Sequence, residues 1–395
     1  MASDARGARV VTSLVNAPVE RPRTVNDVRE FMHESVARDE PVRIIGAGTW
    51  RDAGPPIDAT RTLSLASLSG IIAYVPGDLT ITASAGTTLS ELSHATAAHG
   101  QWLGLDPAGV RDGTIGATIA TASSGPLSHA FGTPRDLVLG LDAVTGYGDV
   151  VRAGGRVVKN VAGFDLVRLY TGSWGTLGAI TSVTMRLRAL PVHDITLALA
   201  IDDAAHFRTL LIALRRDVVS LLACEWIDGP TAQAFGIGDG RDVFVLRLGG
   251  NAAFIRGQRA VLDAVGWSRA CDALVWSRIA NLDCDAAAVV RVSGAVSALP
   301  DRITRIRTAL SENGCRDVAL HGSVHRGLVR IVAAGDVRAL GVMRHVGANE
   351  QRITERAPAS WWAVESDPFS GALDGRIRSA FDPKLLCNRR QATRA

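Results

Sequence analysis

Hydrophobic positions near the N-terminus follow a helical period. Thr24, followed three residues later by Asp27, is typical of a helix cap, and apolar residues then recur at helical spacing. We therefore expect a helix that begins after Thr24 and ends near Asp39. A second cap signature at 88–91 opens a predicted helix that Gly100 would close.

Short runs of alternating or β-branched residues predict strands around these helices. The run PVRIIGAGT at 41–49 predicts a strand that ends in a glycine turn, and LTITASAG at 79–86 predicts a second strand. The segment 136–151, with glycines at its centre, predicts a hairpin. The segment 177–191 predicts a strand that stops at Pro191, where we place a domain boundary.

Between residue 193 and about residue 345, strand patterns alternate with helix patterns. Helices are predicted at about 203–216, 252–265 and 303–314, with strands between them. This rhythm predicts an α+β layer at 192–369, with helices packed on one face of a sheet. The segment 371–388 predicts a short helix stopped at Asp382–Pro383, and we expect residues 370–395 to return to the domain formed by 1–191.

One stretch, 103–133, has almost no periodic signal and is rich in glycine, serine and threonine. A loop of about 30 residues is usually either functional or disordered. Its apolar residues Ile115, Ile119, Leu127 and Phe131 argue against disorder. We therefore expect a functional loop here.

Composition and charge exclude several classes of protein. The net charge of +4 is small for 395 residues, and no basic run or basic–aromatic stripe is present, so no nucleic-acid partner is expected. The five cysteines are far apart and form no CxxC pair, which predicts neither a disulfide framework nor a zinc or iron–sulfur site. No apolar leader and no uncharged stretch of membrane-spanning length occurs, so the cytoplasm is the expected location.

Three separated segments before Pro191 are rich in glycine and hydroxyl residues and nearly free of charge. They are the turn GAGT at 46–49, the loop around 113–125, and the stretch VVKNVAGFDLVRLYTGSWGTLGAIT at 157–181. Glycine-rich backbone exposes N–H groups that can hold a phosphate. The turn at 46–49 alone is equally well a plain turn, and it lacks the third glycine of a Rossmann fingerprint. Together, the three segments predict a long ligand that lies along backbone, as a dinucleotide would.

The sequence also resembles a known family. The segments GTPRDLVLGLDAV at 132–144, GRVVKNVAGFDLVRLYTGSWGTLGAITSVTMRL at 155–187 and FDPKLLCN at 381–388 are similar to the FAD-binding subunit of bacterial glycolate oxidase. That subunit belongs to the wider family with a PCMH-type, or vanillyl-alcohol-oxidase-like, FAD-binding domain. The resemblance implies a two-lobed α+β FAD-binding domain with an α+β cap.

The resemblance also implies which residues bind the cofactor, with the glycines letting backbone pass close to the flavin. The residues are Gly46, Ala47, Gly48, Thr49, Thr114, Ile115, Gly116, Ala122, Ser123, Ser124, Gly125, Arg135, Lys159, Asn160, Gly175, Thr176, Gly178 and Ile180. Relatives with covalent flavin carry a histidine after the glycine turn, and Thr49–Trp50 stands there instead, so noncovalent FAD is expected. An Asn-Pro-Gly ending of the family is replaced by Asn388–Arg389–Arg390.

Catalytic residues are not fixed by the sequence. The candidates are His321, His325 and Arg326, because positions 321 and 325 would share one face of a strand. No acidic third ligand lies in the neighbourhood, so no metal is expected and the pair is interpreted as surface or capping histidines. Asp165 and Arg168 fit an active-site pair and a solvated helix face about equally well. The tryptophan pair at 361–362 is interpreted as core or interface rather than as a stack on the flavin.

By resemblance, the chain is the FAD-binding subunit of a glycolate oxidase-like complex, which oxidises a 2-hydroxy acid such as glycolate or D-lactate or relays its electrons. The expected partners are a larger catalytic flavoprotein subunit and an iron–sulfur subunit, through which the chain could associate with a membrane. Two alternatives stay open: a stand-alone FAD-dependent dehydrogenase, and a structural subunit whose flavin site has decayed.

Overall fold

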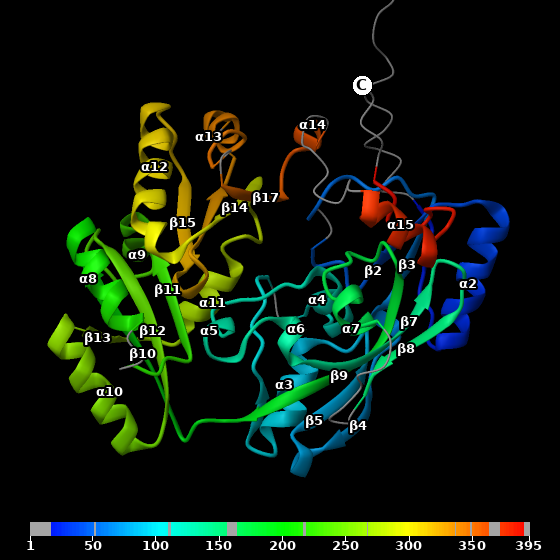
Figure 1. Cartoon of the computed structure of the whole chain (residues 1–395), viewed down its shortest axis with the longest axis horizontal. Helices are drawn as coiled ribbons and strands as arrows, with labels where there is room; N and C mark the ends of the chain where they lie inside the picture. The colour runs from blue at the N-terminus through cyan, green and yellow to red at the C-terminus, as the bar shows by residue number, and fades with distance from the viewer. Residues whose placement is uncertain are drawn as a thin grey trace, which may run out of the picture.

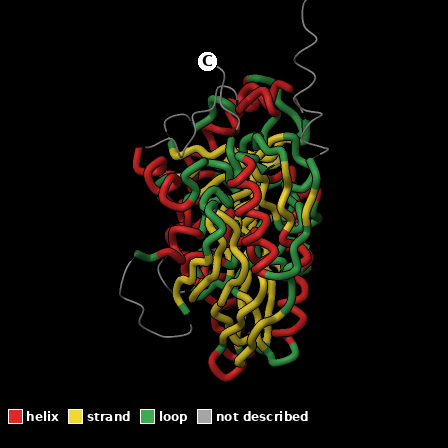
Figure 2. Tube along the Cα trace, turned by 90° about the vertical axis from the view of Figure 1, so that its right-hand side faces the viewer, coloured by secondary structure: helices red, strands yellow, loops and turns green. Residues whose placement is uncertain are grey.

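The structure is a computed structural model of the chain, in which three β-sheets form two neighbouring parts (Figure 1). The described residues are 17–50, 53–109, 112–155, 164–215, 219–266, 268–335, 337–347, 350–362 and 372–390. In a side view the strands form the middle of the molecule, with helices around them (Figure 2). No helix among these residues is long and apolar enough to cross a membrane.

A small parallel sheet forms the first lobe. Its strand order is β1 (Val19–Glu20), β3 (Arg61–Ser64) and β2 (Val42–Ile45). Helix α2 (Val25–Arg38) has the predicted capping box, in which the Thr24 side chain accepts from the Asp27 N–H and Asp27 accepts from the Thr24 N–H. Both the helix and its end at Asp39 are confirmed.

A larger antiparallel sheet forms the second lobe. Its order is β4 (Ile71–Val75), β5 (Thr80–Ser84), β9 (Gly178–Ala189), β7 (Val138–Thr145) and β8 (Val150–Gly154), and β6 (Gln101–Leu103) also pairs with β9. The predicted β7–β8 hairpin and the strand that ends before Pro191 are confirmed. One hydrophobic core joins the two lobes, because Val42 and Leu63 of the small sheet pack with Leu141 and Val183 of the larger one.

Helices and 3-10 turns connect these strands. They are η1 (Leu65–Ser67), η2 (Pro76–Asp78), α3 (Leu89–Ala97), α4 (Ile115–Thr121), α5 (Ser128–Phe131), α6 (Pro134–Leu137) and α7 (Leu166–Tyr170). The prediction of a loop at 103–133 was therefore partly wrong, since it contains α4 and α5. Helix α4 has only seven residues and buries the polar Thr118 together with Ile115, Gly116 and Ile119, so it carries little amphipathic signal.

The cap is built on an eight-stranded sheet. Its order is β13 (Ser268–Cys271), β10 (His193–Ile201), β12 (Asp242–Gly250), β11 (Ala223–Ile227), β15 (Val318–Ser323), β16 (Leu328–Ala333), β14 (Ala288–Ser293) and β17 (Gln351–Arg356). The paired strands in this sheet run antiparallel. The strand order also places strands that are far apart in the sequence, such as β11 and β15, next to each other.

Helices cover both faces of the cap sheet, so the prediction of helices on one face was wrong. The main core lies under α8 (Ala204–Arg215), α10 (Ala252–Val265), α12 (Leu299–Glu312) and α13 (Val337–Met343). A smaller core on the other face includes residues of α9 (Gly229–Ala234) and α11 (Leu274–Asn281). The remaining cap elements are η3 (Val296–Ala298), η4 (Val324–Arg326) and α14 (Ala359–Trp362).

The C-terminal part of the chain lies against the first lobe. Helix α15 (Ala372–Phe381) ends before Asp382, as predicted. Cys387 then pairs with Val42 of β2, and Arg390 pairs with Ile57. The α+β class, with a two-lobed first domain and an α+β cap, is confirmed, whereas the boundaries 1–191, 192–369 and 370–395 stay predictions.

Candidate functional site

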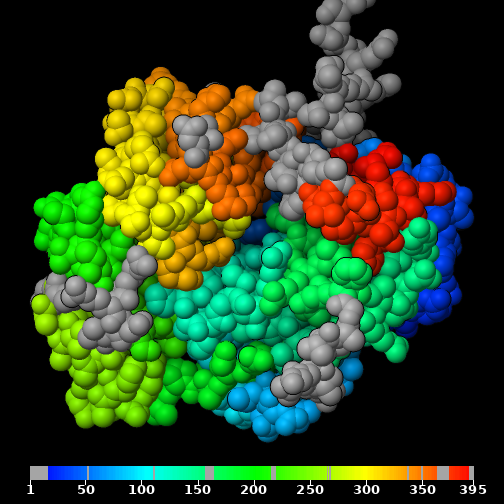
Figure 3. Space-filling view, in the orientation of Figure 1, coloured from blue at the N-terminus to red at the C-terminus, as the bar shows by residue number. Residues whose placement is uncertain are grey.

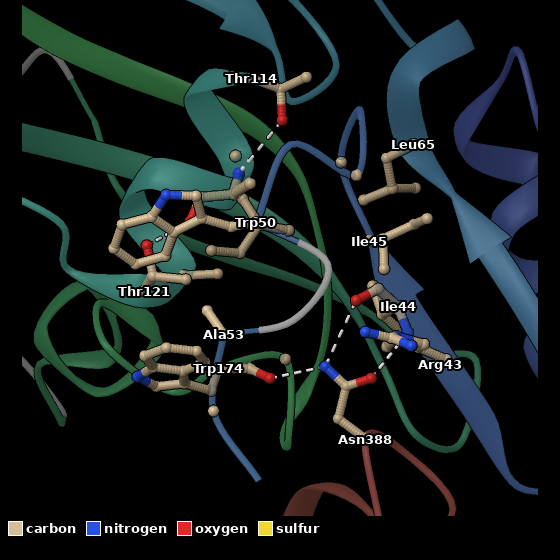
Figure 4. A pocket seen from close by; sticks show the side chains of 18 of the residues that line it. Arg43, Ile44, Ile45, Trp50, Ala53, Leu65, Thr114, Thr121, Trp174 and Asn388 are labelled. Atoms are coloured by element: carbon tan, nitrogen blue, oxygen red, sulfur yellow. Dashed lines mark hydrogen bonds between the residues drawn. The ribbon is translucent and has the colours of Figure 1, made fainter. Parts of the chain in front are cut away.

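The first cavity lies between the two lobes. Its wall combines the glycine turn after β2, the start of α4, the turn before β9 and the C-terminal segment. Among its lining residues are Gly46, Ala47, Gly48, Thr49, Thr114, Gly116, Gly175, Thr176, Gly178 and Ile180. The indole rings of Trp50 and Trp174 lie on one side of it, with Ile45 and Leu65 on the other (Figure 4).

Tight packing holds the glycine turn against α4. A Cβ built at Gly46 would lie 2.1 Å from Thr114 Oγ1. Thr114 is also the N-cap of α4, and its side chain accepts from the Ala117 N–H. The turn that we predicted from 46–49 and the loop that we predicted from 113–125 are therefore one local unit.

The glycines of the third segment are closely surrounded by other parts of the chain. Gly178 has φ +130°, and a Cβ there would lie 2.1 Å from the Val144 carbonyl oxygen. Gly175 has φ +70°, and a Cβ there would lie 2.6 Å from Asn388 Nδ2. At Gly48, which has φ +80°, a Cβ would lie in ordinary van der Waals contact, 3.7 Å from Ile45 Cδ1. Close packing within the chain is therefore a second reason for glycine at 175 and 178, and the cofactor contact that we expect there stays a prediction.

The lining of the first cavity suits an anionic dinucleotide. It carries Arg43 and Arg390 and no acidic side chain among the residues described. Apolar and small side chains make up most of the rest, with Thr114, Thr121, Thr176 and Asn388 as polar groups. A flavin ring system matches apolar walls, and a pyrophosphate matches open glycine backbone and arginine. The residues present therefore fit FAD.

A second cavity lies between the first part of the chain and the cap. The space-filling view shows the surface hollowed where these two parts meet (Figure 3). Trp50, Gly54, Pro55, Thr121, Trp174 and Arg390 line both cavities. The two cavities therefore share a wall, and a ligand in the first would border the second.

His321 lies in the second cavity and is buried, with 3% of its surface exposed. Its Nδ1 atom is 3.1 Å from Oε1 of Glu225, which is 4% exposed. His321 Nε2 and Glu225 Oε2 have no hydrogen-bond partner among the described residues. The interpretation of His321 as a surface residue without an acidic neighbour was wrong, because β15 pairs with β11 and brings Glu225 beside it.

His325 does not share a strand face with His321. Strand β15 ends at Ser323, and His325 lies in the 3-10 turn η4. Its ring packs edge-on against His129 of α5 at 4.9 Å, and its Nδ1 lies 2.9 Å from Ser323 Oγ. It therefore belongs to the contact between the cap and α5. No cluster of three or more His, Cys, Asp or Glu side chains that could hold a metal occurs in the described part of the chain.

Arginines give the second cavity its charge. Arg326 donates from Nη1 to Ser124 Oγ at 2.8 Å and makes no ion pair with a carboxylate of the described residues. Burial, followed by the charge of Arg291, lowers the pKa of Arg326. An arginine that is half buried without a carboxylate partner is a natural binding group for a small anion.

Two other arginines in this cavity are already neutralised. Arg330 pairs with Glu355 and, at 2.7 Å, with Asp283. Arg291 pairs with Glu355 at 3.2 Å. Burial alone would raise the pKa of Glu355, but Arg330 and Arg291 outweigh it and hold that pKa below its usual value. Arg330 and Arg291 are therefore structural parts of the cavity wall. Arg326 is a better candidate than either for binding a negatively charged ligand.

Asp106 adds a titrating group to the second cavity. Its carboxylate accepts from the Leu127 N–H at 3.0 and 3.1 Å. Burial, helped by the nearby charge of Glu225, raises the pKa of Asp106 to about 7. The cavity can therefore gain or lose a proton near neutral pH.

The predicted cofactor residues are divided between the two cavities. Those from the glycine turn, the start of α4 and the turn before β9 line the first cavity, whereas Ala122, Ser123, Ser124, Gly125 and Arg135 line the second. Ile115 is fully buried in the core and its side chain lines neither cavity. Lys159 and Asn160 lie outside the described residues.

The remaining candidates are structural. Asp165 caps α7 and pairs with Arg168 at 3.2 Å on the surface, as expected for a solvated helix face. Trp361 is buried in the cap core, while Trp362 borders the second cavity and donates to the Ala357 carbonyl oxygen.

Sequence reasoning missed Trp174, Asp106 and Glu225 as cavity residues. Asp106 and Glu225 carry no local motif, since the fold alone brings them to the cavity. Trp174 stands inside the glycine-rich stretch and could have been found there, because a bulky residue between two glycines in a loop is unusual.

Comparisons with known proteins agree with this geometry. Residues 17–154 match the family model described as "FAD binding domain". The chain is 36% identical over 169 residues to glycolate oxidase subunit GlcE of Escherichia coli strain K12, covering 42% of this chain and 48% of that protein. It is 31% identical over 214 residues to glycolate oxidase subunit GlcD of Bacillus subtilis strain 168, covering 53% of this chain and 45% of that protein.

A third relative is the mitochondrial D-lactate dehydrogenase [cytochrome] of Arabidopsis thaliana, with 30% identity over 193 residues, 48% of this chain and 34% of that protein. The chain thus spans about half the length, or less, of the curated relatives it matches.

Solved structures extend the likeness in fold to nearly the whole chain. The 4-ethylphenol oxidase of Gulosibacter chungangensis superposes with a TM-score of 0.70 at 14% identity, covering 94% of this chain and 88% of that one. An alkyldihydroxyacetonephosphate synthase superposes with a TM-score of 0.69 at 16% identity, covering 94% and 76%. Residues 17–154 therefore form an FAD-binding domain with FAD as its cofactor, and nearly the whole chain shares its fold with these two solved structures.

Proposed function

We propose that this chain is the FAD-binding subunit of a glycolate oxidase-like complex and that it oxidises a 2-hydroxy acid, such as glycolate or D-lactate, with noncovalently bound FAD. The relatives named glycolate oxidase subunits and D-lactate dehydrogenase support this proposal. The observation that carries the proposal is the wall shared by the two cavities. The first cavity has no acidic side chain among its described lining residues, and the second contains Arg326 and the His321–Glu225 pair.

The chemistry divides between cofactor and protein. When bound, FAD accepts the two electrons and the hydrogen that leave C2 of the hydroxy acid. In the chain, Arg326 binds the substrate carboxylate. His321 Nε2 takes the proton of the substrate hydroxyl, while Glu225 accepts from Nδ1 and so holds the ring with Nε2 free. The product is the 2-oxo acid.

The proposed partners are a larger catalytic flavoprotein subunit and an iron–sulfur subunit, with membrane association through them. A chain that only relayed electrons would need no polar cavity beside the flavin. The second cavity therefore favours a chain that oxidises its own substrate within the complex, over relay alone and over the decayed-site alternative. A stand-alone dehydrogenase would use the same two cavities.

The test is anaerobic reduction of the FAD-loaded chain by glycolate and by D-lactate, followed as loss of flavin absorbance. H321Q should slow reduction by about 100-fold or more, since a positioned base contributes at least that factor. R326A should raise the substrate concentration for half-maximal reduction by about tenfold or more, because it removes a charge-assisted contact. Both variants should keep FAD, since neither residue lines the first cavity.

Two exposed residues provide matched controls. H94Q and R168A should reduce at the wild-type rate, because neither residue lines the two cavities. A chain that binds FAD but is reduced by neither substrate contradicts the catalytic proposal and favours electron relay or another alcohol. If the flavin of H321Q and of R326A is reduced as in wild type, the roles proposed for these two residues are contradicted.

A further inference from the structure

The C-terminal segment forms part of the wall of the first cavity. The Val42 N–H donates to the Leu386 carbonyl oxygen and the Asn388 N–H donates to the Val42 carbonyl oxygen, each at 2.9 Å. On its other side, the Asp58 N–H donates to the Arg389 carbonyl oxygen at 2.7 Å. The segment therefore lies between β2 and residues 57–58 as an added strand.

The side chain of Asn388 bridges two walls of this cavity. Its Oδ1 accepts from the Ile44 N–H at 2.7 Å, and its Nδ2 donates to the Trp174 carbonyl oxygen at 2.6 Å (Figure 4). It is 9% exposed and has φ +43°, a left-handed conformation that asparagine tolerates better than most residues. The amide therefore links β2, which leads into the glycine turn, to the turn that contains Trp174.

Trp174 is held in place through its backbone. It has φ +54°, an uncommon value for a bulky residue, and its N–H donates to the Ala120 carbonyl oxygen at 2.8 Å. Its indole packs on Gly54, where a Cβ would lie 3.1 Å from the ring. Because Trp174 lines both cavities, any rotation of this turn would change their common wall.

We infer that Asn388 is a positioning residue for FAD: it fixes Trp174 and the edge of β2 in the geometry that the bound cofactor contacts, so that the C-terminal segment completes the cofactor site. Ala120 binds the N–H of Trp174 and Asn388 binds its carbonyl oxygen, and no other hydrogen bond to that carbonyl oxygen competes with the Asn388 amide among the described residues. The inference rests on FAD lying in the first cavity, and it does not depend on the substrate.

The chemistry of an amide makes N388D the most informative variant. Aspartate has almost the same shape and keeps an oxygen for the Ile44 N–H, but it places a second acceptor 2.6 Å from the Trp174 carbonyl oxygen. The bond to Trp174 is then lost and replaced by repulsion, and so is the longer contact of Nδ2 with the Ile44 carbonyl oxygen at 3.4 Å, whereas the Ile44 N–H keeps its acceptor. The matched control is R389A, which removes only the exposed ion pair between Arg389 and Asp58 in the same segment.

The experiment is titration of the apo chain with FAD, followed by flavin fluorescence, for wild type, N388D, R389A, W174A and N388D/W174A. N388D should weaken FAD binding by about tenfold or more, the effect of losing a buried hydrogen bond and leaving a group unsatisfied. R389A should stay within about twofold of wild type, as expected for an exposed ion pair. The thermal unfolding of each apo chain is recorded in parallel.

A role through Trp174 also predicts non-additivity. In the W174A background, N388D should cost clearly less FAD affinity than in wild type, because the indole it positions is already gone. Additive losses, or an affinity loss in N388D that matches its loss of apo stability, would overturn the inference. If wild type binds FAD and N388D binds equally well, this inference alone fails. If wild type binds no FAD, the proposed function fails with it.

Discussion

Gly178 joins β9 to the turn before it, at a φ of +130° and with the Val144 carbonyl oxygen 2.1 Å from where a Cβ would lie. Gly46 and Gly116 are enclosed in the same way, by Thr114 Oγ1 and by Ala85. At the residue scale, these glycines let segments of the protein approach each other closely. The cofactor site is therefore shaped by contacts within the chain.

G178A should lower the free energy of unfolding by about 3 kcal/mol or more, because the left-handed backbone and the clash with a backbone carbonyl both count against a side chain. The measurement is urea unfolding of both apo chains. The control is G257A in the middle of α10, where a Cβ would meet nothing within 4 Å and should stabilise the helix by about 0.5–1 kcal/mol. Equal stability of G178A and wild type would contradict this packing account.

Individual site residues could be predicted from the sequence where the residue type itself indicates an unusual backbone, as glycine does. The turn at 46–49 and the glycines at 175 and 178 stand out in the sequence because glycine is costly elsewhere. Glu225 was not foreseen, because its place next to His321 depends on the pairing of two strands 96 residues apart. Asn388 belongs to a segment that the resemblance pointed to, but its contacts with Ile44 and Trp174 require the folded chain.

At the element scale, helix caps were the most predictable features. Thr24 with Asp27 and Thr88 with Glu91 form the capping boxes of α2 and α3 as expected, since the signal lies within four residues. Helix α4 was missed because it is short and buries the polar Thr118 beside its apolar residues, so no polar face marks it as a helix. On the second face of the cap sheet, α9 is short and carries few apolar residues, so it too gives no helical period.

The contact between α5 and η4 should make the chain sensitive to acid. Burial, followed by the neighbouring His129 and Arg326, lowers the pKa of His325 to about 3. The unfolded chain therefore binds a proton between pH 6.5 and about 3 that the folded chain does not, so stability is complete above pH 6.5 and is lost as the pH falls through that window.

The measurement is the free energy of unfolding as a function of pH for wild type and H325Q. Between pH 4 and 6, H325Q should show a slope smaller by about 1.4 kcal/mol per pH unit, the value for one proton. Identical slopes for the two chains would show that His325 is not the group responsible. His129 has its own pKa lowered by burial, so a residual slope should remain.

At the scale of the whole molecule, the cap sheet brings residues that are distant in the sequence together at one site. Along β11, Cys224 and Trp226 face the main cap core while Glu225 faces the opposite side, and along β15 the same alternation puts His321 beside it. The residues 53–54 then reach the cap, where the Gly54 N–H donates to the Glu355 carbonyl oxygen at 2.8 Å. The flavin domain and the cap thus meet at the second cavity.

The fold as a whole was predictable because the family resemblance covered the flavin domain. The cap was predictable only as an α+β layer, since no motif in it fixes the strand order that creates the second cavity. That order decides which side chains face the cofactor domain, and therefore which residues are available for chemistry.

The most direct test of this account is the absorbance spectrum of the purified chain from about 300 to 550 nm, before and after incubation with FAD and removal of the excess. We predict flavin bands corresponding to one FAD per chain, released on denaturation because the cofactor is not covalently attached. A chain that stays colourless after incubation would contradict the central claim that the first cavity is an FAD site.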